Sequence, residues 1–565
     1  MLFEQWEIHG FDRSAAVKLV RAGVNALPAV FLCSRGITTE DDAKHFMTHT
    51  EADILDPFLM LDMDRAVARI TRAIETRETV AVFGDYDVDG MTASALIKSY
   101  LATRGVDAEI YIPGRSEEGY GLNRTALDYL HSRGVNLVIT VDCGITAADE
   151  VEYGKSLGME FVITDHHECK CRMPDACAVV DPKRPESEYP NRVLAGVGVA
   201  FKLVCAMEPH RPLSEMLDLY GDFVAIGTVA DVMPVMGENR ALIREGLRRL
   251  EKSPREGLSA LMRAANVPNA AINTAVIGFM LAPRLNAAGR MGRTSLSIDI
   301  LLTKDPVEAE NLTRELVRLN DQRRELESAI FEEVKLRAVD EPQGVPIVMS
   351  GENWYHGVMG IVAARTAERF MLPAVMINVD EDGIGRGSCR SVGDFKMYTA
   401  LSKCSDLLIN FGGHEMAVGI TIPRENIDEL RTRLAVLYRE QVSERQKPCL
   451  HIDFEVEKPQ LLVLENIESL ALLEPFGNGN LPPCLTISGA TVLNLIPVGG
   501  GKHSRVKIEK DRVTLDCIFF SSPPENLGIA DGDLVDVAFE PQLNEFRGRR
   551  SVQLHVLDIR KTIYS

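Results

Sequence analysis

The sequence has no long apolar run and a deficit of basic residues. None of its apolar stretches approaches the ~18 residues that a membrane-spanning helix needs. The N-terminal stretch "MLFEQWEIHGFDRSAAVKLV" mixes acids with apolar residues and lacks the apolar core of a secretion signal. We therefore expect a cytoplasmic protein without membrane contact. The net charge of −20 argues weakly against a nucleic-acid partner, because phosphates attract Lys and Arg. A global sum does not exclude a local basic channel, however.

Cysteine is also sparse, with 11 residues in a chain of 565. The odd number, the scattered positions and the missing secretion signal favour reduced thiols over a disulfide framework. Only the segment 165–177 crowds cysteines beside histidines: Cys169, Cys171 and Cys177 follow His166 and His167. A zinc site there is an alternative, although no paired CxxC accompanies it.

The order of apolar patterns predicts several domains. Residues 1–75 have helical periodicity, and four short β-branched runs follow at 79–83, 137–141, 161–164 and 177–180. Helical stretches at 91–105 and 146–158 separate the first three runs, which is the βαβ pattern of a parallel sheet. The fold class is therefore α/β in this part of the chain.

The second half changes character twice. A charged helical pattern without glycine spans 306–338, and strands alternate with helices from there to about 446. Short alternating strands begin at 449 and predict a small β-barrel of OB type. We expect four parts: a helical region plus catalytic domain at 1–305, a connecting helix at 306–340, an α/β domain at 341–446 and an OB domain at 447–565.

Each of the four early strands ends at an acid. Asp85, Asp87 and Asp89 follow the first strand, and the acids after the other three are Asp142, Asp165 and Asp181. Another acid, Asp231, follows the apolar stretch 223–230. A helix cap or turn explains any one such acid. Because the carboxyl ends of parallel strands share one edge of a sheet, the whole set predicts a crowded crevice.

So many carboxylates in one crevice need cations to offset their repulsion. Oxygen ligands with one or two imidazoles suit Mn²⁺ or Mg²⁺ better than a sulfur-rich zinc site. Two such ions roughly 3.5–4 Å apart activate water and neutralise charge in phosphoryl transfer. The residues therefore predict phosphoester hydrolysis.

The motifs "GDYDVDG", "VDCG", "DHH" with "VVDP", and "GTVADV" stand in the order found in the DHH phosphoesterase superfamily, which the chain resembles. "FGGHEMAVG" at 411–419 resembles the signature of the associated DHHA1 domain. The resemblance includes the N-terminal region and the segment "LNDQRRELE", so it extends over nearly the whole chain. Within the superfamily, the chain resembles the bacterial members that degrade single-stranded DNA from the 5′ end in recombination and repair.

The resemblance implies two divalent ions, Mn²⁺ or Mg²⁺, and a set of metal ligands: Asp85, Asp87, Asp142, His166 and Asp231. Asp142 is the expected bridge between the ions, and His167 is expected to orient the site or polarise the scissile phosphate. An alignment shifted by two residues would make Asp87 and Asp89 the ligands instead, so the role of Asp89 stays open.

The resemblance also implies substrate-binding residues. Ser388 and Arg390 in "GIGRGSCRS" are expected to hold a 5′-terminal phosphate, and Arg115 to complete that pocket. Tyr120 is a candidate for base stacking. His414 is expected to face the metals and contact substrate phosphate. Surface loops and turns are the ordinary alternatives for these segments.

Two further basic segments are predicted from the residues themselves. "APRLNAAGRMGR" places Arg284, Arg290 and Arg293 on a segment with few large apolar residues, which favours contact with a nucleic-acid backbone. In the C-terminal barrel, "GGGKHSRVKIEKDR" holds Lys502, Arg505 and Lys507. Alternation along "SRVKIEK" points alternate residues to one face, which predicts a basic face for single strands.

Alternative functions remain at this stage. "DYDV" after a strand also fits a HAD-type phosphatase, although such an enzyme has no use for the DHH motif or the barrel. Superfamily phosphodiesterases of short oligonucleotides or cyclic dinucleotides share the catalytic half, and a non-enzymatic scaffold is a third alternative. We expect a monomer that binds single-stranded DNA, with a single-strand-binding protein and a helicase as partners.

Overall fold

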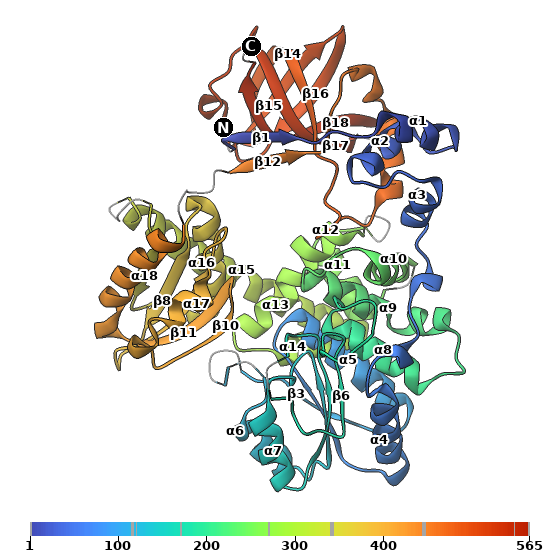
Figure 1. Ribbon diagram of the computed structural model, residues 1–565, viewed down its shortest axis with the longest axis vertical. Helices are drawn as coiled ribbons and strands as arrows, with labels where there is room; N and C mark the ends of the chain where they lie inside the picture. The colour runs from blue at the N-terminus through green and yellow to red at the C-terminus, as the bar shows by residue number, and fades with distance from the viewer. Residues whose placement is uncertain are drawn as a thin grey trace. The chain divides into compact units, whose positions relative to one another are not determined.

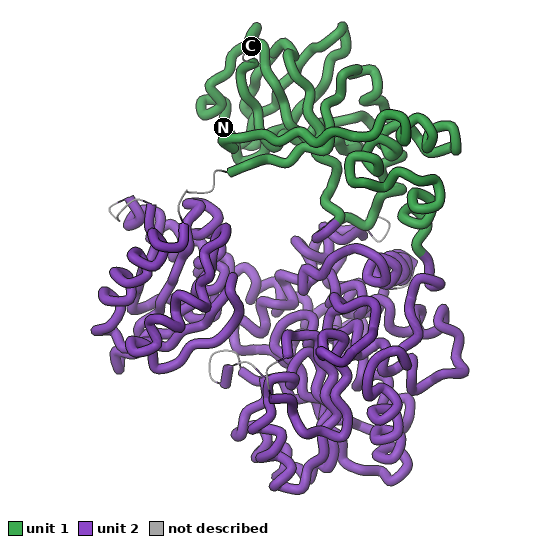
Figure 2. Tube along the Cα trace, in the orientation of Figure 1, with its two compact units in different colours: residues 1–49, 447–476, 480–565 green, residues 50–446, 477–479 purple. Residues whose placement is uncertain are grey.

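The structure is a computed structural model that describes residues 3–114, 118–119, 121–169, 172–252, 254–268, 272–339, 344–442, 448–546 and 549–562. The chain divides into two compact units (Figure 2). Residues 1–49, 447–476 and 480–565 form the first unit, and residues 50–446 and 477–479 form the second. No helix among the described residues is long and apolar enough to cross a membrane.

A five-stranded parallel sheet organises the second unit, in the order β3-β2-β4-β5-β6. Its strands are β2 (Val80–Gly84), β3 (Glu109–Tyr111), β4 (Leu137–Val141), β5 (Glu160–Thr164) and β6 (Ala178–Val180). The four strands predicted from apolar runs are confirmed. The prediction missed β3, because three residues are too few for a hydrophobic pattern to show.

Helices cover both faces of this sheet (Figure 1). One face packs against α6 (Arg124–Ser132) and α7 (Ala148–Ser156). The other packs against α4 (Met63–Thr76), α5 (Val88–Thr103) and α8 (Gly196–Met207). Because both faces are covered, β2 and β4 are buried along their whole length, as parallel strands usually are.

Further helices extend this core towards the connecting helix. They are α9 (Leu213–Ala230), α10 (Gly237–Lys252), α11 (Glu256–Ala264), α13 (Ala282–Arg290) and α14 (Ser295–Leu302). The predicted charged helix is confirmed as α15 (Pro306–Arg337). It begins with proline at its first position and with the Asp305 side chain accepting a hydrogen bond from the N–H of Val307, a favourable N-terminus.

A second α/β domain follows α15. Its mixed sheet has the order β10-β11-β9-β8-β7. The strands are β7 (Ile347–Gly351), β8 (Ala374–Val379), β9 (Ile384–Arg390), β10 (Asn410–His414) and β11 (Ala417–Pro423). The helices of this domain are α16 (Met359–Phe370), α17 (Met397–Ser402) and α18 (Ile427–Gln441).

The first unit is built on a closed five-stranded barrel. It consists of β14 (Leu485–Val498), β15 (His503–Lys510), β16 (Val513–Phe519), β17 (Leu534–Phe546) and β18 (Arg549–Lys561). The pairing of β14 with β17 closes the sheet, so the predicted OB-type barrel is confirmed.

The N-terminal segment packs into this barrel unit. Its elements are β1 (Gln5–Ile8), α1 (Arg13–Arg21), α2 (Ala26–Ser34) and α3 (Glu40–Met47). Leu19, Phe31 and Phe46 share one core with barrel residues such as Leu485 and Phe539. β1 pairs in parallel with β12 (Cys449–Ile452). The structure therefore groups residues 1–49 with the barrel, whereas the sequence analysis grouped them with the catalytic domain.

Candidate active site

The strand-end acids do gather at one edge of the parallel sheet, but they differ in role. Asp85, Asp142, Asp165 and Asp181 each follow the last residue of a strand. Asp85 and Asp142 belong to clusters of potential ligand atoms, whereas Asp165 and Asp181 do not among the described residues. Instead, one carboxylate oxygen of Asp181 accepts a hydrogen bond from the N–H of Lys183 at 2.7 Å.

Three overlapping clusters form the candidate metal centre. In each, one ligand atom per residue lies within 4.8 Å of the others; they are Asp85–Asp87–Asp142, Asp142–His166–His167 and Asp89–His166–Asp231. Asp142 is common to the first two clusters and His166 to the last two. The arrangement therefore suits two neighbouring ions with a shared carboxylate.

The imidazole of His166 faces carboxylate oxygens. Its Nε2 atom lies 3.0 Å from Oδ1 of Asp142 and 3.6 Å from Oδ2 of Asp231. Burial, and secondarily the charge of His167, lowers the pKa of His166 to about 3. A neutral imidazole offers Nε2 as a lone-pair donor, which is the form that binds metal ions.

Asp231 shows that a cation fits this group. Its buried Oδ2 atom accepts no hydrogen bond from any residue that the structure describes. The residue caps the C-terminus of α9, where the helix dipole disfavours a negative charge. Burial first, and then repulsion by Asp89 and Asp87, raises its pKa to about 9. A bound divalent ion would relieve all three penalties.

Asp142 occupies the most constrained position of the cluster. Its backbone has φ of 59°, in the left-handed region that non-glycine residues rarely adopt. A Cβ atom on Gly196 would lie 2.6 Å from the Cβ of Asp142, so only glycine lets α8 begin this close. Burial and repulsion by neighbouring aspartates raise the pKa of Asp142 well above its usual value.

Asp87 and Asp89 both use carboxylate oxygens to cap helices, but to different extents. Oδ1 of Asp87 accepts from the N–H groups of Asp89 and Gly90 at the start of α5, which leaves its second oxygen for an ion. Both oxygens of Asp89 accept backbone N–H groups at the start of α8, at 2.6 and 2.8 Å. This difference favours the register in which Asp85 and Asp87 are ligands.

Asp165 fixes the orientation of His167, a role that the sequence analysis did not assign. Oδ1 of Asp165 lies 2.7 Å from Nδ1 of His167. Burial lowers the pKa of His167, but the hydrogen bond to Asp165 and the surrounding carboxylates raise it overall to about 9. The protonated ring donates Nδ1–H to Asp165, which fixes the orientation of the imidazole.

His414, at the end of β10 in the second α/β domain, lies beside the ring of His167. Its ring is parallel to that of His167 within 6°, with 6.5 Å between the ring centroids. Burial, and then the charge of His167, lowers the pKa of His414. The end of β10 therefore lies beside the DHH motif, although the two segments are far apart in sequence.

Ser388 and Arg390 lie together on β9 beside the start of α16, and we refer to this group as the candidate anion pocket. Nη1 of Arg390 donates to Oγ of Ser388 at 2.9 Å. A Cβ atom on Gly360, in the first turn of α16, would lie 3.1 Å from a guanidinium nitrogen of Arg390 and 3.4 Å from Oγ of Ser388. A hydroxyl, a guanidinium and a helix N-terminus together suit a phosphate.

The three arginines of "APRLNAAGRMGR" differ in environment. Arg290 ends α13, and its Nη1 lies 3.4 Å from the carbonyl oxygen of Gly357, just before α16. Arg284 donates to the carbonyl oxygen of Met280, and Arg293 lies 3.7 Å from a carboxylate oxygen of Glu315.

Two predicted substrate residues, Arg115 and Tyr120, lie outside the described residues, as does Cys171 of the zinc alternative.

No described cysteine belongs to a cluster of potential metal ligands. Burial, followed by the charge of Asp181, raises the pKa of the Cys169 thiol to about 11, which disfavours the thiolate that zinc requires. The described residues therefore give the zinc alternative no support.

The predicted basic face of the barrel carries mixed charge. Lys502, Arg505 and Lys507 are all exposed. However, two nitrogens of Arg505 each lie 2.8 Å from an oxygen of Asp516 on the neighbouring strand β16. Part of the positive charge on this face is therefore compensated within the barrel, and the two lysines carry the rest.

The same outer face has an aromatic site that the sequence analysis missed. Phe520 is 53% exposed, and the rings of His503 and His555 contact it edge-on, with centroids 5.4 and 5.3 Å away. The N–H of Ser521 donates to Nδ1 of His503 and fixes that ring. The only sequence signal was the doubled Phe at 519–520, where one ring fills the core and the next must point outwards.

The parallel sheet, the acid-rich edge and the DHH histidines define a DHH-type phosphoesterase. Sequence models of known families match three segments of the chain. They are the DHH family N-terminal domain at 79–228, the DHHA1 domain at 344–439 and the RecJ OB domain at 452–558. The chain belongs to the RecJ family of single-stranded-DNA-specific exonucleases. This assignment rejects the HAD-type alternative.

Individual relatives cover most of the chain. The RecJ exonuclease of Bacillus subtilis is 36% identical over 562 residues, which cover 98% of this chain and 70% of that protein. The Escherichia coli RecJ is 33% identical, and the aligned region covers 88% of this chain and 90% of the Escherichia coli protein. A crystal structure of Thermus thermophilus RecJ in complex with Mn²⁺ superposes with a TM-score of 0.84, at 29% identity over 99% of this chain and 80% of that one.

Proposed function

We propose that this chain degrades single-stranded DNA in the 5′→3′ direction during recombination and repair, with two divalent ions, Mn²⁺ or Mg²⁺. The proposed ligands are Asp85, Asp87, Asp142, His166 and Asp231. One observation carries the proposal: Asp142 is common to two ligand clusters, and its Oδ1 also lies 3.0 Å from His166. A shared carboxylate is what a two-ion phosphodiesterase needs.

When bound, the two ions supply an activated water and neutralise the charge that develops on the phosphate. The side chains of the protein then have separate roles. Asp142 and His166 hold the centre at the edge of the sheet. His167, kept protonated and oriented by Asp165, donates Nε2–H to an oxygen of the scissile phosphate. His414 lies beside His167 and contacts the same substrate phosphate.

The anion pocket sets the polarity of the reaction. A terminal phosphate carries one more negative charge than a phosphodiester, so Arg390 and Ser388 together with the start of α16 discriminate a 5′ end from the chain interior. Arg290 contacts the neighbouring backbone. We keep Arg115 and Tyr120 as proposed substrate residues on the basis of the resemblance alone.

The barrel holds the strand beyond the cleavage point. Lys502 and Lys507 contact backbone phosphates, and Phe520 stacks on an unpaired base, because OB barrels bind oligonucleotides on this face. The described cysteines are free thiols, which suits the cytoplasm where we place the enzyme. A monomeric state and partnership with a single-strand-binding protein and a helicase complete the proposal.

A substrate comparison tests this function. Purified protein should degrade long single strands with Mn²⁺ or Mg²⁺, leave blunt duplexes intact and lose activity in EDTA. The alternative is a phosphodiesterase that hydrolyses short oligonucleotides or cyclic dinucleotides. Such enzymes of the superfamily share the catalytic half of this chain. Faster turnover of a cyclic dinucleotide than of a long single strand would favour that alternative.

A further inference from the structure

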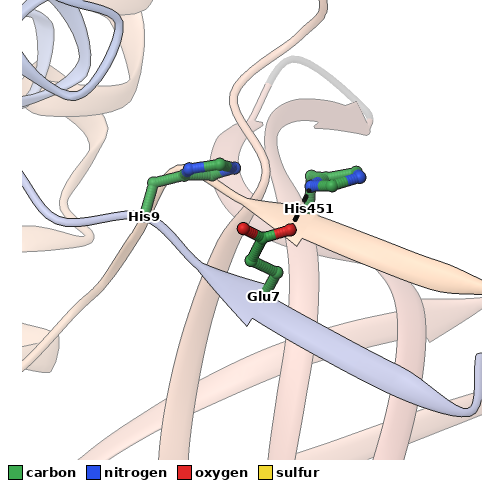
Figure 3. Close-up of side chains that lie close together, drawn as sticks. All are labelled: Glu7, His9 and His451. Atoms are coloured by element: carbon green, nitrogen blue, oxygen red, sulfur yellow. Dashed lines mark ion pairs between the residues drawn. The ribbon is translucent and has the colours of Figure 1, made fainter.

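Two histidines and a glutamate from distant parts of the sequence meet on the surface of the first unit. Glu7 belongs to β1, His9 follows that strand, and His451 belongs to β12 (Figure 3). Glu7 is directly opposite His451 in the parallel pair. The N–H of His9 donates to the carbonyl oxygen of Ile452 at 2.8 Å, so the pairing continues past β1.

The opposite side of this two-stranded sheet is fixed to the barrel. Trp6 and Leu450 point to that side because side chains alternate along a strand. Nε1 of Trp6 donates to Oδ2 of Asp558 at 3.0 Å, and the guanidinium of Arg560 lies 4.1 Å from its ring centroid. Leu450 is buried in a small cluster. The backbone that carries the three polar side chains is therefore held in place.

The three side chains converge on one point. Nδ1 of His451 lies 3.0 Å from Oε2 of Glu7, and one ligand atom from each of the three residues lies within 4.8 Å of the others. The two imidazole planes differ by only 22°, with 5.7 Å between centroids. Figure 3 shows the rings of His9 and His451 side by side, with the Glu7 carboxylate close to the gap between them. The side chains of His451 and Glu7 are 64% and 58% exposed, so an ion can enter directly.

We propose that Glu7, His9 and His451 form a binding site for one divalent cation of the zinc class, which ties β1 to β12. Two imidazoles and one carboxylate favour Zn²⁺, Ni²⁺ or Cu²⁺ over Mg²⁺ and Mn²⁺, which prefer oxygen ligands. Three protein ligands leave a position for water, as in open zinc sites. The site is chemically distinct from the carboxylate-rich centre proposed for catalysis and does not depend on it.

The consequence is a metal-dependent clamp on the N-terminal segment. β1 has only four residues, and β12 is the one strand that pairs with it in the part of the chain that the structure describes. An ion bound to side chains of both strands stabilises their pairing by mass action, since it binds the folded arrangement. Zinc should therefore stabilise the barrel unit without being required for hydrolysis.

Trp6 provides a local reporter for the test. The chain has two tryptophans, so a Trp354→Phe background leaves Trp6 as the sole emitter beside the site. With the full chain in excess Mg²⁺, Ni²⁺ should quench this fluorescence saturably at micromolar concentration, and Zn²⁺ should reverse the quenching. His9→Ala and His451→Ala should each weaken Ni²⁺ binding by at least about tenfold, since each removes one of three ligands. Glu7→Gln tests the carboxylate in nearly the same shape.

The matched control is His131→Ala, which removes an exposed histidine from α6 and should leave binding unchanged. Calorimetric titration with Zn²⁺ should count one equivalent fewer for the double variant His9→Ala/His451→Ala than for the parent. Equal stoichiometry in the two proteins would overturn the proposal, as would quenching that appears only at millimolar metal. Equal loss in His131→Ala would also overturn it.

Discussion

Both carboxylate oxygens of Asp89 cap helix α8, with Oδ2 accepting the N–H of Gly196 at 2.6 Å. The third acid of "GDYDVDG" thus joins the first strand motif to a helix that begins more than a hundred residues later. It positions the Gly196 end of α8 against Asp142. We therefore propose the two preceding acids, Asp85 and Asp87, as ligands of the ions.

Substitution separates these roles. Asp85→Asn should abolish hydrolysis with little change in stability, because it removes a ligand charge. Asp89→Asn should lower the free energy of unfolding by about 1–3 kcal/mol, since the amide NH₂ cannot accept one of the two buried N–H groups. Activity assays and urea denaturation check both variants. Full activity in Asp85→Asn, or inactivity without destabilisation in Asp89→Asn, would support the shifted register instead.

Asp142→Asn tests the shared carboxylate. Asparagine tolerates the left-handed backbone at this position, so the fold should survive. Hydrolysis should fall by at least about a thousandfold, because the loss of ion stabilisation is worth several kcal/mol and each 1.36 kcal/mol is a factor of ten. Asp128→Asn on the surface of α6 is the matched control. Activity of Asp142→Asn within a few-fold of the parent would remove Asp142 from the centre.

The crowded carboxylates also predict how stability depends on pH. Asp231 and His167 both have folded-state pKa values of about 9, above their unfolded values. Between about pH 6.5 and 9 the folded protein therefore holds protons that the unfolded chain lacks, so stability falls as pH rises. In EDTA the free energy of unfolding should fall by roughly 2 kcal/mol per pH unit over this range, because each of the two groups contributes up to about 1.36 kcal/mol per unit.

Divalent ions should reverse this trend. Mn²⁺ binds deprotonated ligands, so the stabilisation it gives should grow with pH. The difference in melting temperature between Mn²⁺ and EDTA, measured by calorimetry, should be larger at pH 9 than at pH 6.5. An Asp231→Asn variant should show a shallower slope in EDTA. A constant difference across this range would contradict the assignment of these groups to an ion site.

The sequence predicted the catalytic core well because its signals are local. Short apolar runs that end in acids specify parallel strands and their shared edge, which brought Asp85 and Asp142 together as expected. Contacts set by distant segments were not visible. The cap from Asp89 to α8 and the approach of Gly360 to Arg390 depend on how helices pack. Helical periodicity likewise could not show that Phe31 packs against the barrel rather than the parallel sheet.

The barrel is expected to contribute to single-strand binding in two ways, by ionic contacts and by base stacking, and the salt dependence of binding distinguishes them. Lys507→Glu should weaken binding to single strands and reduce the salt dependence by roughly 0.7 units of log–log slope, because one phosphate is no longer neutralised. Phe520→Ala should weaken binding by about 1–3 kcal/mol with little change in that slope, since stacking is not ionic. Arg505→Ala should matter less than Lys507→Ala, because Asp516 already pairs with Arg505. Fluorescence anisotropy over a salt series measures all three; identical slopes for Lys507→Glu and the parent would remove the basic face from the platform.

The anion pocket predicts discrimination between ends. Arg390→Ala should weaken binding of 5′-phosphorylated strands more than of 5′-hydroxyl strands, because a guanidinium contributes most to a doubly charged phosphate. Ser388→Ala should act in the same direction with a smaller effect. Arg369→Ala, an exposed arginine near the end of α16, is the control. Equal losses on both kinds of end would mean that Arg390 contacts only the backbone.

Digestion of end-labelled single strands tests the central claim most directly. With Mn²⁺ present, a 5′-labelled strand should release its label at once as a mononucleotide, while a 3′-labelled strand should shorten progressively and release its label last. Neither should change in EDTA or with Asp142→Asn. Release of the 3′ label first, or internal cuts in both substrates, would contradict a 5′→3′ exonuclease.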